Sequence, residues 1–147
     1  EKNGLIGFTF NSPNLSLAKC QIPRWEGCVS ANQEMINWHE ETNIPLFSWS
    51  AQAGGFFSGK FSRDNFDDQE MVDVFYNKEN WERYDRAVKK KKKKNVSPTQ
   101  IALAYVLHQK FPTTAVIGPE KLDELLSSYN GSNIELTSKE VEWLDLK

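Results

Sequence analysis

The sequence predicts an α/β fold built on a parallel sheet. Three short apolar segments, at residues 5–10, 46–49 and 114–117, have the length and composition of buried strands. Helix-like segments separate them, and strands that alternate with helices favour parallel pairing. With 147 residues, 39% of them hydrophobic, the chain has the size and composition of one globular domain.

The first third of the chain contains two of these strands. The segment Leu5–Phe10 ends at Asn11-Ser12-Pro13, which is typical of a turn. A helix is expected over Ala31–Thr42, with His39 on its polar side. The second strand, Leu46–Trp49, shows almost no polar alternation, so we expect both of its faces to be covered.

The middle of the chain combines a glycine-rich loop with charged segments. Residues 62–77 are polar and acidic and are predicted to be irregular, and a helix is expected over Asn80–Lys94. The run Lys89–Lys94 is interpreted as the solvated end of that helix, where cations interact favourably with the helix dipole. The alternative is a docking site for nucleic acid or anionic lipid, but the net charge of −2 argues against nucleic acid as a partner.

The last third begins with a strong helix start. In Ser97-Pro98-Thr99-Gln100 the serine can cap, the proline fits the first turn and the glutamine can bond back to the cap. The helix should run to Gln109 and be buried, because it is apolar on most sides. Thr114–Ile117 is the third predicted buried strand, ended by Gly118-Pro119.

Two further helices close the chain. Leu122, Leu125, Leu126 and Tyr129 have the spacing of one apolar helix face, ended by Asn130-Gly131. Thr137-Ser138-Lys139-Glu140 is a second capping box, which opens a helix with Val141 and Leu144 facing inward.

Functional residues of a parallel sheet gather where its strands end. The largest such segment here is the loop Ser50–Lys60, in which Gly54–Lys60 reads G-x-x-x-x-G-K. A triphosphate-binding loop would need Ser or Thr where Phe61 stands, and a helix directly after it. A plain turn and a cofactor-binding loop remain the other two interpretations.

Cysteine and histidine usage predicts no metal site and no catalytic residue. Cys20 and Cys28 are expected to be free thiols in a reducing cytosol, so we expect a cytoplasmic protein. A metal site that uses both cysteines and His39 would lack any known ligand spacing. No Ser-His-Asp or Cys-His arrangement can be recognised, and no apolar run is long enough to cross a membrane.

Four stretches, in order, resemble the C-terminal half of the aldo-keto reductases, a family of nicotinamide-dependent TIM-barrel enzymes. They are SPNLSLAK (Ser12–Lys19), PLFSWSAQAGGFFSGKF (Pro45–Phe61), SPTQIALAYVL (Ser97–Leu107) and TTAVIGPEKLDELLSS (Thr113–Ser128). The resemblance implies a partial (β/α)8 barrel containing strands six to eight with their helices. Residues 1–147 would then be the C-terminal portion of one barrel domain.

The resemblance also implies a binding site for NADP or NAD. Trp49 would stack on the nicotinamide ring, Ser12 would take the place of a carboxamide-binding Gln, and Lys60 would face the phosphates. Backbone groups of residues 50–54 would surround the pyrophosphate, and residues 118–128 would line the adenosine. The complete implied set is Ser12, Trp49, Ser50, Ala51, Gln52, Ala53, Gly54, Lys60, Gly118, Glu120, Glu124, Ser127 and Ser128.

Two departures from the family pattern change what the resemblance implies. Glu120 and Glu124 are acidic where many members hold the 2′-phosphate of NADP, which makes NAD plausible. The family's catalytic Asp, Tyr, Lys and His belong to strands two to four, which have no counterpart here. We therefore expect the cofactor-binding portion of a carbonyl reductase, inactive alone and using a small carbonyl substrate only with the missing half.

The incomplete barrel leaves three expectations open. Three strands cannot close an eight-stranded barrel, and Glu1 follows no initiator Met, so we expect a portion of a longer polypeptide. A truncated product rebuilt into a small open sheet could instead self-associate through its open edges. The remaining alternative is a non-catalytic nucleotide-binding or regulatory module that uses Lys89–Lys94 for a partner.

Overall fold

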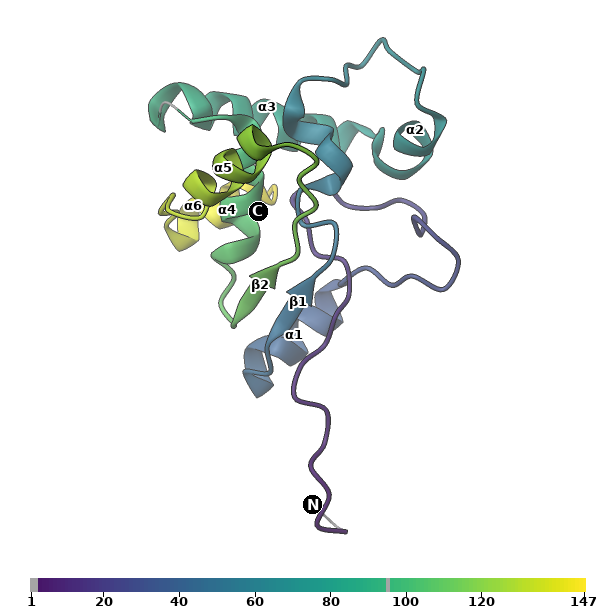
Figure 1. Ribbon diagram of the computed structural model, residues 1–147, viewed down its shortest axis with the longest axis vertical. Coiled ribbons are helices and arrows are strands. Elements are labelled where there is room, and N and C mark those ends of the chain that lie inside the picture. Colours follow the sequence, from purple (N-terminus) through teal and green to yellow (C-terminus); the bar gives the residue numbers. More distant parts are fainter. Residues whose placement is uncertain (1–2, 95) are drawn as a thin grey trace.

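Two short parallel strands with helices around them form the centre of the computed structural model, which describes residues 3–94 and 96–147, without the side chains of 92–94 (Figure 1). This is the predicted α/β class. The elements are α1 (Gln33–Thr42), β1 (Leu46–Ser48), the 3₁₀ helix η1 (Ala53–Ser58), α2 (Gln69–Phe75), α3 (Lys78–Lys94), α4 (Pro98–Leu107), β2 (Thr113–Ala115), α5 (Leu122–Gly131) and α6 (Ser138–Leu144).

The sheet pairs the predicted second and third strands in parallel. Leu46 lies opposite Thr113, and the Val116 N–H donates to the Ser48 carbonyl over 2.8 Å. On the other side of β1, Asn11 forms an isolated parallel bridge with Leu46. The Asn11 N–H donates to the Pro45 carbonyl over 3.0 Å. The three segments therefore lie side by side with β1 in the middle.

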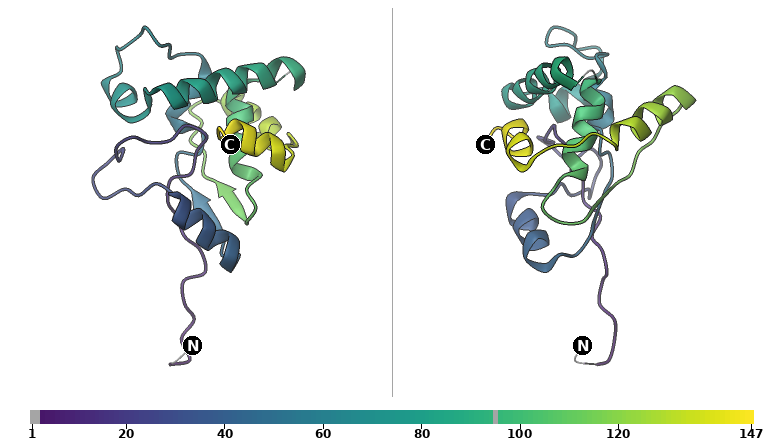
Figure 2. Two further views of the ribbon diagram at one scale, coloured as in Figure 1. Left: turned by 180° about the vertical axis from the view of Figure 1, so that it is seen from behind. Right: turned by 90° about the vertical axis from the view of Figure 1, so that its left-hand side faces the viewer.

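The prediction of a buried strand over Leu5–Phe10 is wrong. This segment has no strand pairing, and Ile6 and Phe8 are 90% and 98% exposed. It runs away from the body of the molecule in all three ribbon views (Figures 1 and 2). Of its aromatic side chains, Phe10 contacts Phe47 of β1, with 4.8 Å between the ring centroids, but Phe8 is almost fully exposed. A strand needs paired neighbours to be stable.

The third strand forms where it was predicted, but it is not buried as predicted. The strand ends at Ala115, two residues earlier than predicted, and Val116 is exposed. Within the described residues β2 pairs only with β1, so β2 is an edge. A side chain on an edge strand is covered only if another element lies over it.

The main core lies where η1, α2, α3 and α4 meet. Phe56 and Phe57 of η1 are fully buried, and the Phe56 ring centroid lies 4.7 Å from that of Trp81. The prediction that residues 62–77 are irregular is wrong in part, because α2 forms within them. The Asp68 side chain caps α2 by accepting from the Met71 N–H over 3.1 Å.

Helix α4 confirms both its predicted start and its predicted burial. Ser97 and Gln100 form the reciprocal capping box, with Pro98 in the first turn. Residues 101–106 are all buried, because η1, α3, α5 and β2 contact this helix.

The expected helix over residues 31–42 is confirmed as α1, but His39 does not lie on a polar side. It is fully buried, its ring stacks on Phe111 at 5.1 Å, and its Nδ1 lies 2.7 Å from the Ile44 carbonyl oxygen. Asn43 ends the helix in the left-handed conformation, with φ of 55°, and the following residues fold over the histidine.

The last two helices differ in how they are covered. In α6 the predicted capping box of Thr137 and Glu140 is present, and Leu144 is buried. Helix α5 forms and ends at Gly131 as predicted, but its apolar face is uncovered, with Leu122 and Tyr129 about two-thirds exposed. Figure 2 shows α5 projecting from the body.

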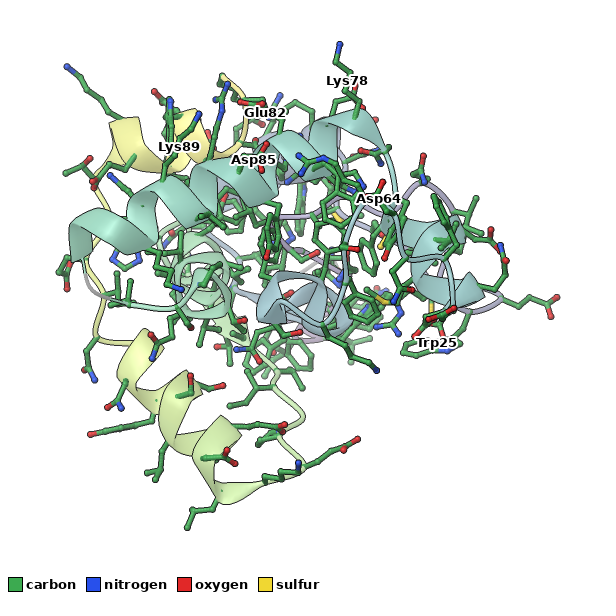
Figure 3. All side chains as sticks on the ribbon, turned by 90° about the horizontal axis from the view of Figure 1, so that it is seen from above. Trp25, Asp64, Lys78, Glu82, Asp85 and Lys89 are labelled. Carbon is green, nitrogen blue, oxygen red and sulfur yellow. The ribbon has the colours of Figure 1, made fainter. Side chains whose placement is uncertain are left out.

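Charged side chains follow one another along α3, as Lys78, Glu82, Asp85 and Lys89 show in Figure 3. The predicted solvated lysine run holds only in part. Lys89 and Lys91 are exposed, but Lys90 forms an ion pair with Glu140 of α6. The side chains of Lys92–Lys94 lie outside the described residues. None of the helices described is long and apolar enough to cross a bilayer.

Candidate functional site

The chain that leaves β1 turns through a run of left-handed backbone. Ser50 and Ala53 have φ of 51° and 53°, and Gly54 and Gly55 have φ of 58° and 81°. Positive φ is uncommon for residues other than glycine, and such strain concentrates at ligand sites. The Ala53 N–H donates to the Ser50 carbonyl over 2.8 Å, which closes the turn. We call residues 50–55 the strand-end loop.

An arginine that the sequence did not reveal holds this loop. The Arg24 Nη1 donates to the Ser50 Oγ over 2.7 Å, and its Nε and Nη2 donate to the Glu70 Oε1 over 2.9 and 2.6 Å. Only 13% of the Arg24 side chain is exposed. Arg24 and Ser50 are 26 residues apart, and no local pattern links them.

The predicted nicotinamide-stacking residue has an aromatic neighbour. Trp49 is half-buried, and its ring centroid lies 5.5 Å from that of Trp25. Figure 3 places Trp25 at the periphery of the molecule, and its ring lies 5.0 Å from the Arg24 guanidinium carbon. The Asn14 Nδ2 donates to the Trp49 carbonyl over 2.9 Å, which fixes the backbone from which the indole projects.

Ser12 lies at the same strand end. Its hydroxyl donates to the Phe47 carbonyl over 2.8 Å. The structure thus brings Ser12 beside β1, but the hydroxyl proton is already used by a backbone acceptor. A ligand carboxamide could receive a hydrogen bond from Ser12 only if this bond were given up.

Two glutamines connect the strand-end loop and α4 to α5. The Gln52 Nε2 donates to the buried Ser128 Oγ over 3.1 Å, and the Gln100 Nε2 donates to the Ser127 carbonyl over 2.9 Å. The structure therefore joins two predicted parts of the site, the loop after β1 and the helix after β2.

Two acidic residues near the start of α5 are joined by a hydrogen bond from the backbone of one to the carboxylate of the other. The Glu120 N–H donates to the Glu124 Oε2 over 2.9 Å, and both residues are exposed, as is Gly118. A carboxylate near a helix N-terminus interacts favourably with the helix dipole. This end of the molecule therefore carries negative charge that helix geometry stabilises.

Lys60 is not brought to the other predicted residues. It is exposed, its ammonium lies 5.3 Å from the Phe61 ring centroid, and it forms no ion pair within the described residues. The triphosphate-loop alternative also lacks its helix, because the next helix begins only at Gln69. No helix N-terminus follows Gly54–Lys60 to face a phosphate.

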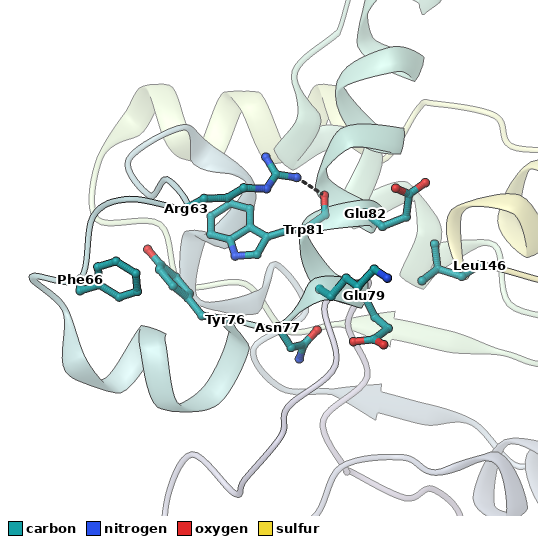
Figure 4. A pocket seen from close by; sticks show the side chains of 9 residues that line it. Arg63, Phe66, Tyr76, Asn77, Glu79, Trp81, Glu82 and Leu146 are labelled. Carbon is teal, nitrogen blue, oxygen red and sulfur yellow. Dashed lines mark hydrogen bonds between the residues drawn. The ribbon is translucent and has the colours of Figure 1, made fainter.

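A cavity of about 730 Å³ is shown in Figure 4, and none of the residues that line it belongs to the strand-end loop. Trp81 and Tyr76 form an aromatic wall, and Arg63 already covers it, with its guanidinium carbon 5.1 Å from the Trp81 ring. The Arg63 Nη2 also donates to the Trp81 carbonyl over 3.2 Å. The full lining is Arg63, Phe66, Tyr76, Asn77, Lys78, Glu79, Trp81, Glu82 and Leu146.

A partly buried ion cluster joins the C-terminal end of the chain to the helices. The Lys19 Nζ lies 3.0 Å from the Tyr105 hydroxyl and 3.2 Å from the Asp145 Oδ1. Burial lowers the pKa of Lys19, but Tyr105 and Asp145 outweigh it and raise the pKa above its ordinary value. A lysine held protonated in this way acts as a structural cation.

The cysteines are unbonded to each other, and burial raises the pKa of the Cys20 thiol. The His39 ring contacts the Ile44 carbonyl and the Phe111 ring, and neither contact involves a cysteine. Across residues 3–94 and 96–147 no three His, Cys, Asp or Glu side chains gather as a metal site.

Comparison with known proteins gives two findings. A family model described as the aldo/keto reductase family matches residues 8–147. Among solved structures, the chain is similar to a thermostable aldo-keto reductase in complex with the inhibitor epalrestat, with a TM-score of 0.60 and 11% identity. The match covers 92% of this chain but 38% of that one, so the chain spans well under half of that relative's length.

Proposed function

Because this chain belongs to the aldo/keto reductase family, we propose that it is the cofactor-binding portion of an oxidoreductase that reduces aldehydes or ketones with NADH or NADPH. The likeness in structure identifies its α/β arrangement as part of a TIM barrel. Active sites of such barrels lie at the C-terminal ends of the strands, which is where the strand-end loop lies.

The observation that carries the proposal is the geometry of the strand-end loop. Its left-handed backbone turns the chain directly after β1, and Gln52 connects it to Ser128 of α5. A Cβ at Gly54 would lie 2.9 Å from the Arg24 Nη1, so the loop needs glycine at its closest approach. These features fit the phosphates and sugar of a dinucleotide laid across the two strand ends.

In this proposal each predicted residue has a specific place. Trp49 offers an aromatic face to the nicotinamide ring, and residues 50–54 surround the pyrophosphate. Lys60 would have to move toward the phosphates to contribute its charge. Residues 118–124 line the adenosine, and Ser127 and Ser128 lie beside the adenine. Ser128 supports the site through Gln52, because its hydroxyl is buried and already accepts that bond.

The nicotinamide cofactor would supply the hydride, and this chain would hold and orient it. Reduction also needs a proton donor within hydrogen-bond reach of the carbonyl oxygen. We propose that this donor lies outside the chain and that the chain alone is inactive. The relative contains a further 62% of its length beyond the matched part, as its 38% coverage shows.

Titration with NADH and NADPH, followed by quenching of tryptophan fluorescence, tests the proposal. We expect Trp49→Ala to weaken binding about tenfold, since stacking on an aromatic side chain contributes about 1–3 kcal/mol. Trp38→Ala, which removes a partly exposed indole from α1, is the matched control and should leave affinity unchanged. If neither this chain nor a longer chain that contains the remaining barrel strands binds either dinucleotide, the proposal is wrong.

The second candidate is a regulatory module that binds an anionic partner through the lysine run. The exposure of Lys89 and Lys91 favours it, and the pairing of Lys90 with Glu140 counts against it. Replacement of all six lysines by Gln would reduce retention on heparin if the run binds anions. Unchanged retention would exclude this candidate.

A further inference from the structure

We propose that Arg24 is a positioning residue for the phosphate end of the dinucleotide and that it acts through Ser50. This inference rests on the proposed function and adds a residue that the family resemblance did not supply. It starts from the three hydrogen bonds that the Arg24 guanidinium makes, one to the Ser50 Oγ and two to the Glu70 Oε1.

The guanidinium is held rigidly and close to the loop. Glu70 of α2 accepts from two of its nitrogens, and the third is left to face Ser50. The planar guanidinium loses little conformational freedom per bond when it is held in this way. The same nitrogen, Nη1, packs against Gly54, the most closely approached glycine of the strand-end loop.

The bond from Arg24 determines what the Ser50 hydroxyl can do. Because the Ser50 Oγ accepts from Nη1, its own proton is available to a second acceptor. A hydroxyl whose oxygen accepts from a cation is a stronger donor, and a phosphate oxygen is the strong acceptor that suits it. Arg24 also holds Ser50 at φ of 51°, a conformation that serine adopts only with support.

Charge at this point favours an anion. The Arg24 side chain is 13% exposed, whereas that of its partner Glu70 is 48% exposed. Solvent screens the carboxylate more than the guanidinium, so a group bound at the loop experiences net positive charge. This charge offsets the carboxylates of Glu120 and Glu124 at the other end of the proposed site.

A purely structural explanation makes a different prediction. If Arg24 only fastened the loop to α2, loss of either partner would have the same effect. If the charge of Arg24 supports phosphate binding, Arg24→Gln removes that charge. Glu70→Gln keeps the charge of Arg24 and removes only the carboxylate that partly neutralises it. The two variants break the same ion pair but should change affinity for NADH in opposite directions.

The test is NADH affinity of the 147-residue chain at several salt concentrations, with melting temperature measured alongside. We expect Arg24→Gln to weaken binding at least about tenfold, as for loss of a charge-assisted hydrogen bond, and to reduce the salt dependence. Glu70→Gln should bind as tightly as the unchanged chain or more tightly. Arg24→Lys should recover part of the loss. Arg24→Gln should weaken binding less in a chain that already carries Ser50→Ala than in the unchanged chain, because the part of its effect that passes through Ser50 is then absent.

The matched control is Arg63→Gln. It breaks an ion pair outside the strand-end loop, in which the Arg63 Nη2 lies 2.8 Å from the Asp85 Oδ2, and it should leave NADH affinity unchanged. Equal weakening by Arg24→Gln and Glu70→Gln would overturn the inference while the proposed function stands. No NADH binding by the unchanged chain would overturn both. If Arg24→Gln does not fold, the other two variants test the inference. Weaker NADH binding by Glu70→Gln would contradict it, and so would unchanged NADH binding by Ser50→Ala.

Discussion

Two buried polar side chains at the centre of this protein, Ser48 and Asn80, are matched with specific backbone partners. Ser48 accepts from the Leu15 N–H over 3.0 Å, and Asn80 accepts from the Lys19 N–H and donates to the Lys19 carbonyl, both over 2.8 Å. Burial of a polar group without such a partner costs free energy, so these residues stabilise the fold. Glu120 and Glu124 differ, because they are exposed and their charge is open to a ligand.

At this scale we expect Glu120→Lys to shift preference from NADH toward NADPH. The change replaces repulsion of the 2′-phosphate by attraction and leaves the bond from the residue-120 N–H to Glu124 intact. An exposed charge pair at contact distance is worth about 1 kcal/mol, so the ratio of the two affinities should change about fivefold. The two dissociation constants, measured by fluorescence, check this.

The control for that change is Glu142→Lys, which alters net charge equally on α6. It should shift both affinities together and leave their ratio unchanged. An unaltered ratio in Glu120→Lys would mean that residue 120 lies away from the ribose.

One carboxylate of α6 both caps its own helix and binds α3. Glu140 belongs to the capping box of α6 and also pairs with Lys90 of α3. The bond from Lys90, with those from Thr137, lowers the pKa of Glu140 from its ordinary value of 4.5 to about 2. Glu140 therefore stabilises the first turn of α6 and at the same time binds that helix to α3.

The lowered pKa predicts how stability depends on pH. Since the folded-state pKa lies below the unfolded value of 4.5, the stabilisation is complete above that pH and is lost as pH falls toward about 2. We expect Glu140→Gln to reduce the free energy of unfolding at pH 7 by about 1 kcal/mol, a value discounted for solvent exposure. In urea unfolding, Glu140→Gln should be less stable than the unchanged chain at pH 7, and the two should have nearly equal stability at pH 2.

Glu142→Gln on the same helix is the control, because its contact with Lys110 is longer, at 3.5 Å, and exposed. It should change stability little at either pH. A deficit in Glu140→Gln that persists at pH 2 would show that the ion pair is not its cause.

Among the described residues, α5 and the chain after β2 leave apolar side chains uncovered. The exposed side chains of α5, together with Val116 after β2, lie at the edge of the sheet where a barrel would continue. Exposed apolar side chains that gather on one helix often mark a contact surface. We expect self-association through this edge when no further barrel strands cover it.

Sedimentation of the chain should therefore show concentration-dependent association. Replacement of Leu122, Leu125 and Leu126 by Gln should shift the population toward monomer, because these side chains are exposed and the helix itself tolerates Gln well. Ile22→Gln, which removes an exposed apolar side chain elsewhere, should leave association unchanged. Association that survives the triple replacement would assign it to another surface.

Much of the fold could be predicted from local signals. The capping boxes at Ser97 and Thr137, the helix spanning residues 33–42 and the parallel direction of strand pairing are all local in origin or follow from element order. The helix α2 was missed because its short apolar pattern, Met71, Val74 and Phe75, lies within an acidic segment. Short helices depend on packing more than on intrinsic propensity, so their sequences signal them weakly.

The sequence by itself determined most of the helices and the two paired strands, and it indicated the family, because spacing, capping residues and glycine positions act over a few residues. Only the tertiary structure decided which apolar segments are covered. It left Leu5–Phe10 and the apolar face of α5 exposed and buried His39, since burial depends on what the rest of the chain places nearby. For the same reason the contact between Arg24 and Ser50, between residues far apart in the chain, could be seen only after folding.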